Sequence, residues 1–168
     1  VGPWPWSREV MAQLSERLSS AGVQLQLYDI TFPEEREGDE AFLAELRQGN
    51  AVIAQVPVLS SSMPEAATDS TIRTGVMTHA MNGLVCENFP QASNFVANNA
   101  VFSAVPKGHI ATLVDSDGAV RRIPAAICVD GQTYPALAIS ALLTATGTTK
   151  WSGSVRDASG LTAPAQWL

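Results

Sequence analysis

The chain has 168 residues, 46% hydrophobic and 15% charged, which predicts one folded domain and not a disordered chain. Its 16 acidic residues outnumber the 10 basic ones, so the formal net charge is −6. Nucleic-acid binders need a basic face to neutralise phosphates, and the basic residues here are scattered. We therefore expect neither nucleic acid nor an anionic lipid surface as a partner.

No stretch of the chain reads as the roughly 20 consecutive apolar residues that a transmembrane helix needs. The longest uncharged runs, Asn88–Pro106 and Gly131–Thr149, are diluted by polar residues and proline. The stretch Val1–Glu9 lacks the basic and apolar regions of a signal peptide. Because the sequence begins with valine, we expect a fragment or processed product whose membrane anchor, if any, lies outside it.

An amphipathic helix is predicted over residues 7–21. Ser7 is a suitable N-cap, because its hydroxyl can accept a hydrogen bond from an early backbone N–H. Gly22 suits the position after the helix, where a positive φ is common. Four apolar residues recur at helical spacing and are predicted to face the core: Val10, Leu14, Leu18 and Ala21.

The next segments continue an alternation of helix and strand. Apolar and polar residues alternate over 23–30, which predicts a strand, and the apolar run 51–56 predicts a buried strand. Between them Asp39 is expected to cap a helix over 39–48. This order favours an α/β layer with right-handed crossovers.

The segment 57–106 carries only weak patterns. It begins with a serine-rich loop, shows faint helical periodicity over 66–81, and suggests a loop with a short helix over 87–106. Weak local preferences are typical of elements with low local stability. We therefore expect 57–106 to be the part of the domain that moves, between rigid units at 7–56 and 109–146.

The pattern sharpens after that segment. Strands are predicted over 109–114 and 119–129, joined by a turn at Asp117-Gly118, because Asp-Gly between apolar runs favours a hairpin. A helix is predicted over 135–146, with a proline in its first turn. Together these elements predict an α/β fold: a layered mixed β-sheet with helices packed on it, containing one β-hairpin.

The predicted domain covers residues 1–147. Residues 148–168 are rich in Gly, Ser, Thr and Pro, and we expect an irregular tail or the start of a further segment. The two cysteines, Cys86 and Cys128, could be buried thiols or one disulfide, and the sequence leaves both open.

No catalytic, metal or cofactor motif is found. The run 115–118 resembles part of a calcium loop, but Leu113 stands where the first carboxylate ligand is required. The histidines and cysteines match no common zinc-ligand spacing, and His109 is expected to be an ordinary surface histidine. We therefore predict no catalytic residue, no metal and no cofactor.

Four residues are candidates for binding a ligand: Asp29, Asp115, Arg121 and Arg122. Asp29 ends a buried strand, where open α/β sheets place their sites, so it should line a cleft or bond a neighbouring backbone group. Arg121 and Arg122 are adjacent on a strand, so one should face inward or along the edge. Either they anchor an anionic ligand or they pair with Asp115, Asp117 or Asp29.

Two parts of the sequence resemble the type-two CHASE domain, a sensory module associated with cyclases and histidine kinases. The first part reads GPWPWSR over 2–8 and LYDITFPE over 27–34. The second part reads VDSDGAVRRIP over 114–124 and DGQTYPALA over 130–138. The likeness implies the N-terminal part of a larger module that faces outward from a bacterial inner membrane, in the periplasm or outside the cell.

The resemblance also implies a role. Such modules are joined across the membrane to adenylate cyclases, diguanylate cyclases, histidine kinases or Ser/Thr kinases. We expect a sensor without catalytic activity of its own, with an unknown small molecule as ligand and a homodimer as one possible state. Two alternatives are a small hydrolase-like enzyme working through Asp29, Asp115 or His109, and a structural or dimerisation module without a ligand.

Overall fold

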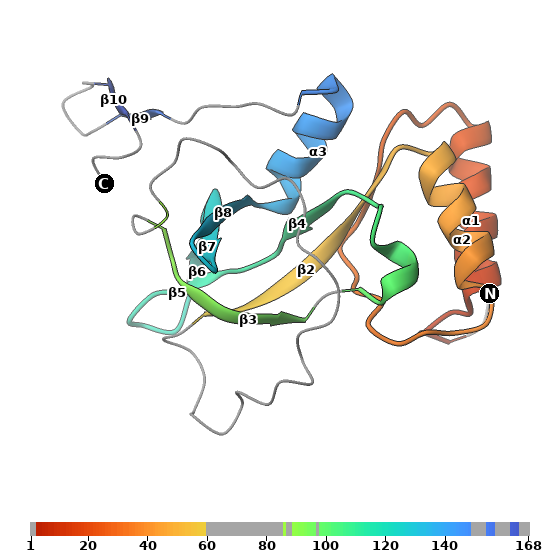
Figure 1. Ribbon diagram of the computed structural model, residues 1–168, viewed down its shortest axis with the longest axis horizontal. Coiled ribbons are helices and arrows are strands. Elements are labelled where there is room, and N and C mark those ends of the chain that lie inside the picture. The colour runs from red at the N-terminus through yellow and green to blue at the C-terminus, as the bar shows by residue number, and fades with distance from the viewer. Residues whose placement is uncertain are drawn as a thin grey trace.

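The computed structural model describes residues 3–59, 86, 89–96, 98–148, 154–156 and 162–164 (Figure 1). Its helices are α1 (Arg8–Ser20), α2 (Asp39–Gln48), the short 3-10 helix η4 (Ala100–Phe102) and α3 (Leu137–Thr146). Its strands are β1 (Gln26–Tyr28), β2 (Ala51–Leu59), β3 (Ala92–Val96), β4 (Lys107–His109), β5 (Leu113–Val114), β6 (Val120–Arg122), β7 (Ala126–Val129), β8 (Gln132–Pro135), β9 (Ser154–Arg156) and β10 (Thr162–Pro164).

The long strand β2 is the centre of the main sheet. Strands β1 and β4 pair with its first half in parallel, and β3 pairs with its second half in antiparallel orientation. Smaller antiparallel pairs are β5 with β6, β7 with β8, and β9 with β10. Figure 1 shows α1 and α2 side by side at one end of the molecule and the β5–β6 hairpin at the other. The predicted α/β fold with a mixed sheet and a hairpin is confirmed.

Several predicted boundaries are confirmed and others shift. Ser7 caps α1 by accepting from the Val10 N–H at 3.4 Å, as expected. Gly38, not Asp39, is the N-cap of α2, and the Asp39 carboxylate is free for other bonds. The predicted strand 119–129 is two strands, β6 and β7, interrupted around Pro124, which has no N–H to donate. The C-terminal helix begins at Leu137, because the residues before it pair with β7.

The predicted buried face of α1 is wrong. The helix buries Arg8, Met11, Ala12 and Ser15, while Val10, Leu14 and Leu18 are half-buried and Ala21 is exposed. The reason is polar: Ser15 donates to Gln26 Oε1 at 2.9 Å, and Gln26 Nε2 donates to the Ser15 carbonyl at 3.0 Å. These buried bonds orient the helix toward β1 by a face that apolar periodicity alone does not reveal.

Part of the weakly patterned segment 57–106 belongs to the sheet. Residues 57–59 continue β2, and β3 pairs with them. Within 87–106 the described residues form β3 and η4, so the expected short helix exists beside an unpredicted strand. The expected helix over 66–81 lies outside the described residues, and motion of the segment stays a prediction.

Two apolar clusters form the described core. The first joins α1, α2, β1 and η4 around four aromatic rings, whose centroids lie 5.3–5.8 Å apart in mostly edge-to-face pairs: Tyr28, Phe32, Phe42 and Phe102. The second joins the β2–β3 end to β7 and includes Leu59, Phe95, Ile127 and Val129. Gly108 lets α3 lie directly on β4, since a Cβ there would meet the Leu137 Cα at 2.5 Å.

A buried ion pair joins the first residue of α1 to the first residue of α2. Arg8 Nε donates to Asp39 Oδ1 at 2.5 Å, and the side chains are only 7% and 5% exposed. The other oxygen, Oδ2, accepts from the Arg36 N–H at 2.9 Å and from Asn99 Nδ2 at 2.9 Å. Asn99 also caps η4, so one carboxylate holds three separate elements.

The neighbouring Asn98 extends this network to the sheet. Its side chain is fully buried; Oδ1 accepts from the Phe32 N–H at 2.8 Å, and Nδ2 donates to the Ala54 carbonyl at 3.0 Å. The amide therefore satisfies two backbone groups that the end of β1 leaves without a strand partner.

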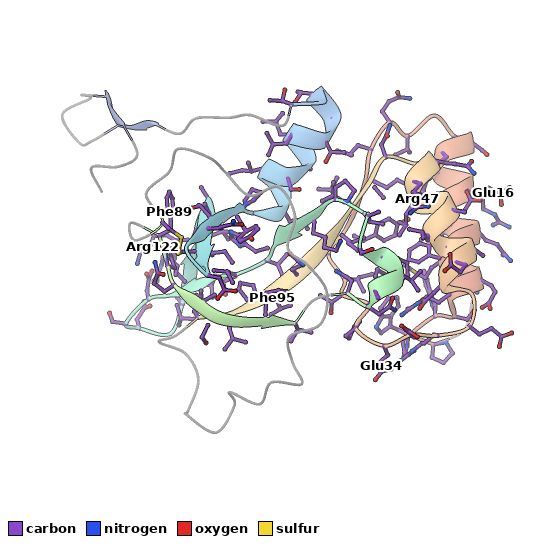
Figure 2. The ribbon with its side chains drawn as sticks, in the orientation of Figure 1. Glu16, Glu34, Arg47, Phe89, Phe95 and Arg122 are labelled. Carbon is purple, nitrogen blue, oxygen red and sulfur yellow. A yellow bond between two sulfur atoms is a disulfide. The ribbon has the colours of Figure 1, made fainter. Side chains whose placement is uncertain are left out.

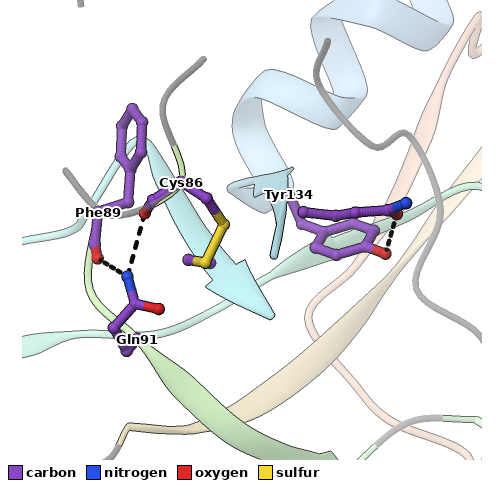
Figure 3. Close-up of a disulfide and its surroundings, with 6 residues drawn as sticks. Cys86, Phe89, Gln91 and Tyr134 are labelled. Carbon is purple, nitrogen blue, oxygen red and sulfur yellow. Dashed lines mark hydrogen bonds between the residues drawn. A yellow bond between two sulfur atoms is a disulfide. The ribbon is translucent and has the colours of Figure 1, made fainter. Parts of the chain in front are cut away.

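Cys86 and Cys128 form a disulfide, with Cα atoms 5.2 Å apart (Figure 3). Of the two alternatives that the sequence left open, the bridged one is therefore correct. Gln91 Nε2 donates to the carbonyls of Cys86 and Phe89 at 3.0 and 2.8 Å, which fixes the approach of the chain to β7. Among the described residues, no helix has the length and apolarity needed to cross a membrane.

Loss of the disulfide should destabilise the domain strongly. The bridge closes a sequence separation of 42 residues, for which the chain-entropy estimate is about 4 kcal/mol. We expect reduction of the wild type to lower the Tm by about 10 °C. Thermal unfolding of wild type and of the Cys86→Ser/Cys128→Ser double variant, each with and without reductant, measures this. The Tm of the variant should equal that of the reduced wild type and should not change when reductant is added. If reductant left the wild-type Tm unchanged, the bridge would contribute nothing to stability.

Breaking the buried ion pair should also be costly. In Asp39→Asn the Arg8 charge stays buried without its counter-charge, and we expect a loss of about 3–5 kcal/mol. In a cycle with Arg8→Met the double variant should lose less than the sum of the single variants, as measured by urea unfolding. The matched control is the exposed pair Glu34–Arg36, where Arg36→Gln should cost under about 1 kcal/mol. Equal losses at both pairs would contradict a central role for Arg8–Asp39.

Candidate ligand-binding site

A hollow of about 290 Å³ lies where the segment before α1 meets the loop after β1. We call it the Trp4 pocket. Its lining is Trp4, Pro5, Trp6, Arg8, Met11, Ile30, Thr31, Phe32, Pro33, Glu34 and Arg36. This volume is at the lower end of small-molecule sites, so it suits a small ligand and not a large one.

One side of the pocket is aromatic. The rings of Trp4 and Trp6 meet edge to face with centroids 5.7 Å apart, and the peptide bond between Trp4 and Pro5 is cis. Trp4 is 57% exposed, which is unusual for so large an apolar side chain. An exposed indole at the mouth of a hollow can cover the apolar part of a ligand.

The other side is cationic. Arg8 is almost fully buried, and its guanidinium lies 4.6 Å from the centre of the Phe32 ring. Its Nε and Nη2 donate to Asp39 and to the Glu34 carbonyl, the latter at 3.3 Å. Among the described residues, no acceptor is bonded to Nη1. A buried guanidinium that lines a hollow with a donor to spare favours an anion there.

The rim of the pocket carries a loose ion pair. Arg36 Nη2 lies 2.6 Å from Glu34 Oε2, and both side chains are largely exposed, Glu34 at 71%. The hydrogen bond from Arg36 lowers the pKa of Glu34, so the carboxylate stays ionised near neutral pH. Exposed pairs of this kind contribute little stability, so either side chain can turn to another partner.

Three of the predicted site residues come together on the β5–β6 hairpin. Arg121 forms a forked pair with Asp117, at 2.9 and 2.8 Å, and also contacts Asp115 at 3.1 Å. Arg122 Nη2 pairs with the other oxygen of Asp115. These bonds lower the pKa of both aspartates.

One of these arginines was expected to face inward or along the sheet edge, and the inward position is wrong. Arg121 and Arg122 are 58% and 69% exposed, because among the described strands β5 and β6 pair only with each other. Figure 2 shows Arg122 at the opposite end of the molecule from Glu34. Of the alternatives for these arginines, the structure shows pairing with aspartates.

Asp29 is not part of either group. It follows β1 and is exposed, and it lines a second, more apolar groove of about 450 Å³ together with Leu14, Leu18 and Leu27. This groove adjoins the Trp4 pocket, since Trp4, Trp6, Met11 and Ile30 line both. The structure therefore does not bring Asp29 and the hairpin arginines into one cleft. A ligand role for Asp29, Asp115, Arg121 and Arg122 stays a prediction.

Two buried basic side chains lie on β4, outside these sites. Lys107 is 1% exposed and donates to three carbonyls, of Phe102, Ser103 and Val105, at 2.8–2.9 Å, so it ends η4 as a structural cap. Burial lowers its pKa to about 8. His109 is also 1% exposed, so the surface position expected from the sequence is wrong.

The surroundings of His109 do not suit catalysis. Its Nδ1 accepts from the Ala111 N–H at 3.2 Å, which puts the proton of the neutral ring on Nε2, and Nε2 is buried with no partner among the described atoms. No described group of three or more His, Cys, Asp or Glu residues could hold a metal ion.

His109 should make the domain acid-sensitive. Burial lowers its pKa from 6.5 to about 4. Between pH 6.5 and pH 4 the histidine is therefore protonated in the unfolded chain and neutral in the folded one. Stability from this residue is present above pH 6.5 and falls by up to about 3 kcal/mol toward pH 4. Urea unfolding at pH 7, 5.5 and 4.5 should show a smaller fall for His109→Asn than for wild type. Parallel curves for the two proteins would exclude His109 as the cause.

The sequence pointed to the Trp4 pocket only indirectly. Indole rings bury large apolar areas, so the sequence alone favours packing as the role of Trp4 and Trp6. Arg8 carries no signal of its own, because nothing in the local pattern shows that a helix start will be buried. The one available signal was the resemblance, since the strings at 2–8 and 27–34 are the two segments that form the pocket.

Comparison with known proteins agrees with that signal. The family model described as CHASE2 domain matches residues 1–165. No curated protein and no solved structure matches the chain. The family match covers nearly the whole sequence, including both strings that carry the resemblance. The chain belongs to the CHASE2 family, and its role is therefore that of an extracellular sensory domain and not of a catalyst.

Proposed function

We propose that this chain is the extracytoplasmic input domain of a bacterial membrane signalling receptor and that it binds a small molecule in the Trp4 pocket. The receptor's anchor and its output, a cyclase, diguanylate cyclase, histidine kinase or Ser/Thr kinase, lie outside this sequence. The domain includes residues 1–147, and the family match continues to residue 165, over the described β9–β10 pair.

The observation that carries the proposal is the position of Arg8. The Arg8 guanidinium is held by hydrogen bonds to Asp39 and to the Glu34 carbonyl, and it has one further donor at a hollow. It is therefore preorganised for a partner that is not part of the fold. A structural module would have no need of such a donor. The disulfide agrees with a location outside the cytoplasm, because reducing compartments disfavour such bridges.

The hydrolase alternative finds less support. His109 is a poor base, because its Nδ1 accepts a hydrogen bond and its Nε2 is buried without a described partner. Asp115 is already paired with two arginines on the hairpin. The dimerisation alternative has one supporting feature, the exposed apolar residues Val114, Val120 and Ile123 on and beside the hairpin. A homodimer that forms through this surface is compatible with ligand binding at the Trp4 pocket.

A metabolite screen by thermal unfolding tests the proposal. A ligand at 100 times its Kd stabilises the fold by about 2.7 kcal/mol, which should raise the Tm by about 5–10 °C. Trp4→Ala should abolish the shift with little change in the Tm of the free protein, because Trp4 is exposed. Stabilisation that survives Trp4→Ala would move the site elsewhere. Saturable hydrolysis lost in Asp29→Ala or Asp115→Ala would favour the enzyme instead.

A further inference from the structure

We infer that the Trp4 pocket takes a small organic monocarboxylate whose body is apolar, such as an aryl- or alkyl-substituted acid. This inference rests on the proposed function and adds the chemical class of the ligand. It is drawn from the charges, donors and walls of the pocket.

The first step is the charge of the lining. Arg8 and Arg36 contribute two positive charges and Glu34 one negative charge, so the lining residues sum to +1. Asp39 binds Arg8 from the buried side, so the four charged groups together sum to zero. When a ligand carboxylate displaces the exposed Glu34 side chain from Arg36, the remaining Arg8, Arg36 and Asp39 sum to +1, which matches one negative charge and not the two of a phosphate monoester.

The second step is the geometry of the donors. Arg8 has Nη1 to offer, and Arg36 uses Nη2 on an exposed carboxylate, so its remaining guanidinium donors face no described acceptor. Guanidinium groups bind carboxylates through short, charge-assisted bonds. Arg36 already binds a carboxylate, because its Nη2 lies 2.6 Å from Glu34 Oε2. A ligand carboxylate can take that place at small cost, because the pair it displaces is largely exposed.

The third step is the apolar body. The pocket is also lined by Trp4, Pro5, Trp6, Met11 and Ile30, whose side chains carry no charge. Indole rings cover large apolar areas at little conformational cost, and Trp4 has more than half of its surface free to do so. A hollow of about 290 Å³ leaves room for one ring or a short branched chain.

The test uses three probes of one shape: 3-phenylpropionate, its amide, and 3-phenylpropylamine. We expect the carboxylate to bind the intact chain at least about tenfold more tightly than the amide, and the amine not to bind, by calorimetric titration at pH 7. Arg36→Gln should weaken the binding of the carboxylate about tenfold and leave the affinity for the amide unchanged. Trp4→Ala should weaken the binding of both probes. The matched control, Arg47→Gln, removes an exposed arginine of α2 away from the pocket and should change nothing.

Four outcomes would overturn the inference. Equal affinity for carboxylate and amide would show that charge does not select the ligand. Carboxylate binding that Arg121→Gln abolishes and Arg36→Gln leaves intact would place the site at the β5–β6 hairpin. If none of the three probes binds while neutral or cationic members of the metabolite screen stabilise the fold through Trp4, the ligand class is wrong and the sensory function stands. If no compound of any class binds, the proposed function fails with it.

Discussion

The buried Arg8–Asp39 pair is the interaction on which the rest of the described structure depends. Removing two charges from water is costly, and hydrogen bonds to neighbouring groups offset part of that cost. Here Asp39 meets Arg8, the Arg36 N–H and Asn99, while Arg8 also reaches the Glu34 carbonyl. The loop between β1 and α2 is held in place by these bonds, and that loop forms one wall of the Trp4 pocket.

The elements that sequence alone predicted well are those whose local pattern and tertiary environment agree. The helix at 39–48 buries Phe42, Leu43 and Leu46 as its periodicity indicates, and the Asp-Gly turn does join two antiparallel strands. In each case the apolar spacing or the need for a positive φ is settled within a few residues. Nothing distant competes with it, so a local argument is sufficient.

Prediction failed where a distant polar contact decides the structure. α1 turns toward the core by its Ser15 face because Gln26, eleven residues later, binds Ser15 through both its amide atoms. Asp39 is the first residue of its helix and not the cap, and its carboxylate binds Arg8, 31 residues earlier. His109 is buried although its type is usually exposed. The candidate site shows the same limit: three of its four residues do meet, but on the β5–β6 hairpin they form ion pairs among themselves and with Asp117.

The same network gives a pocket of this kind a way to act at a distance. A ligand can shift an equilibrium only by contacts that differ between two states. An anion at Arg8 Nη1 would bind the same guanidinium that holds Asp39, the first residue of α2. Asp39 also accepts a hydrogen bond from Asn99, whose side chain caps η4. Through Asn98 the next bond reaches the centre of β2. Ligand binding in the pocket would therefore change the hydrogen bonds at the starts of α2 and η4 first, because consecutive hydrogen bonds connect both to the ligand.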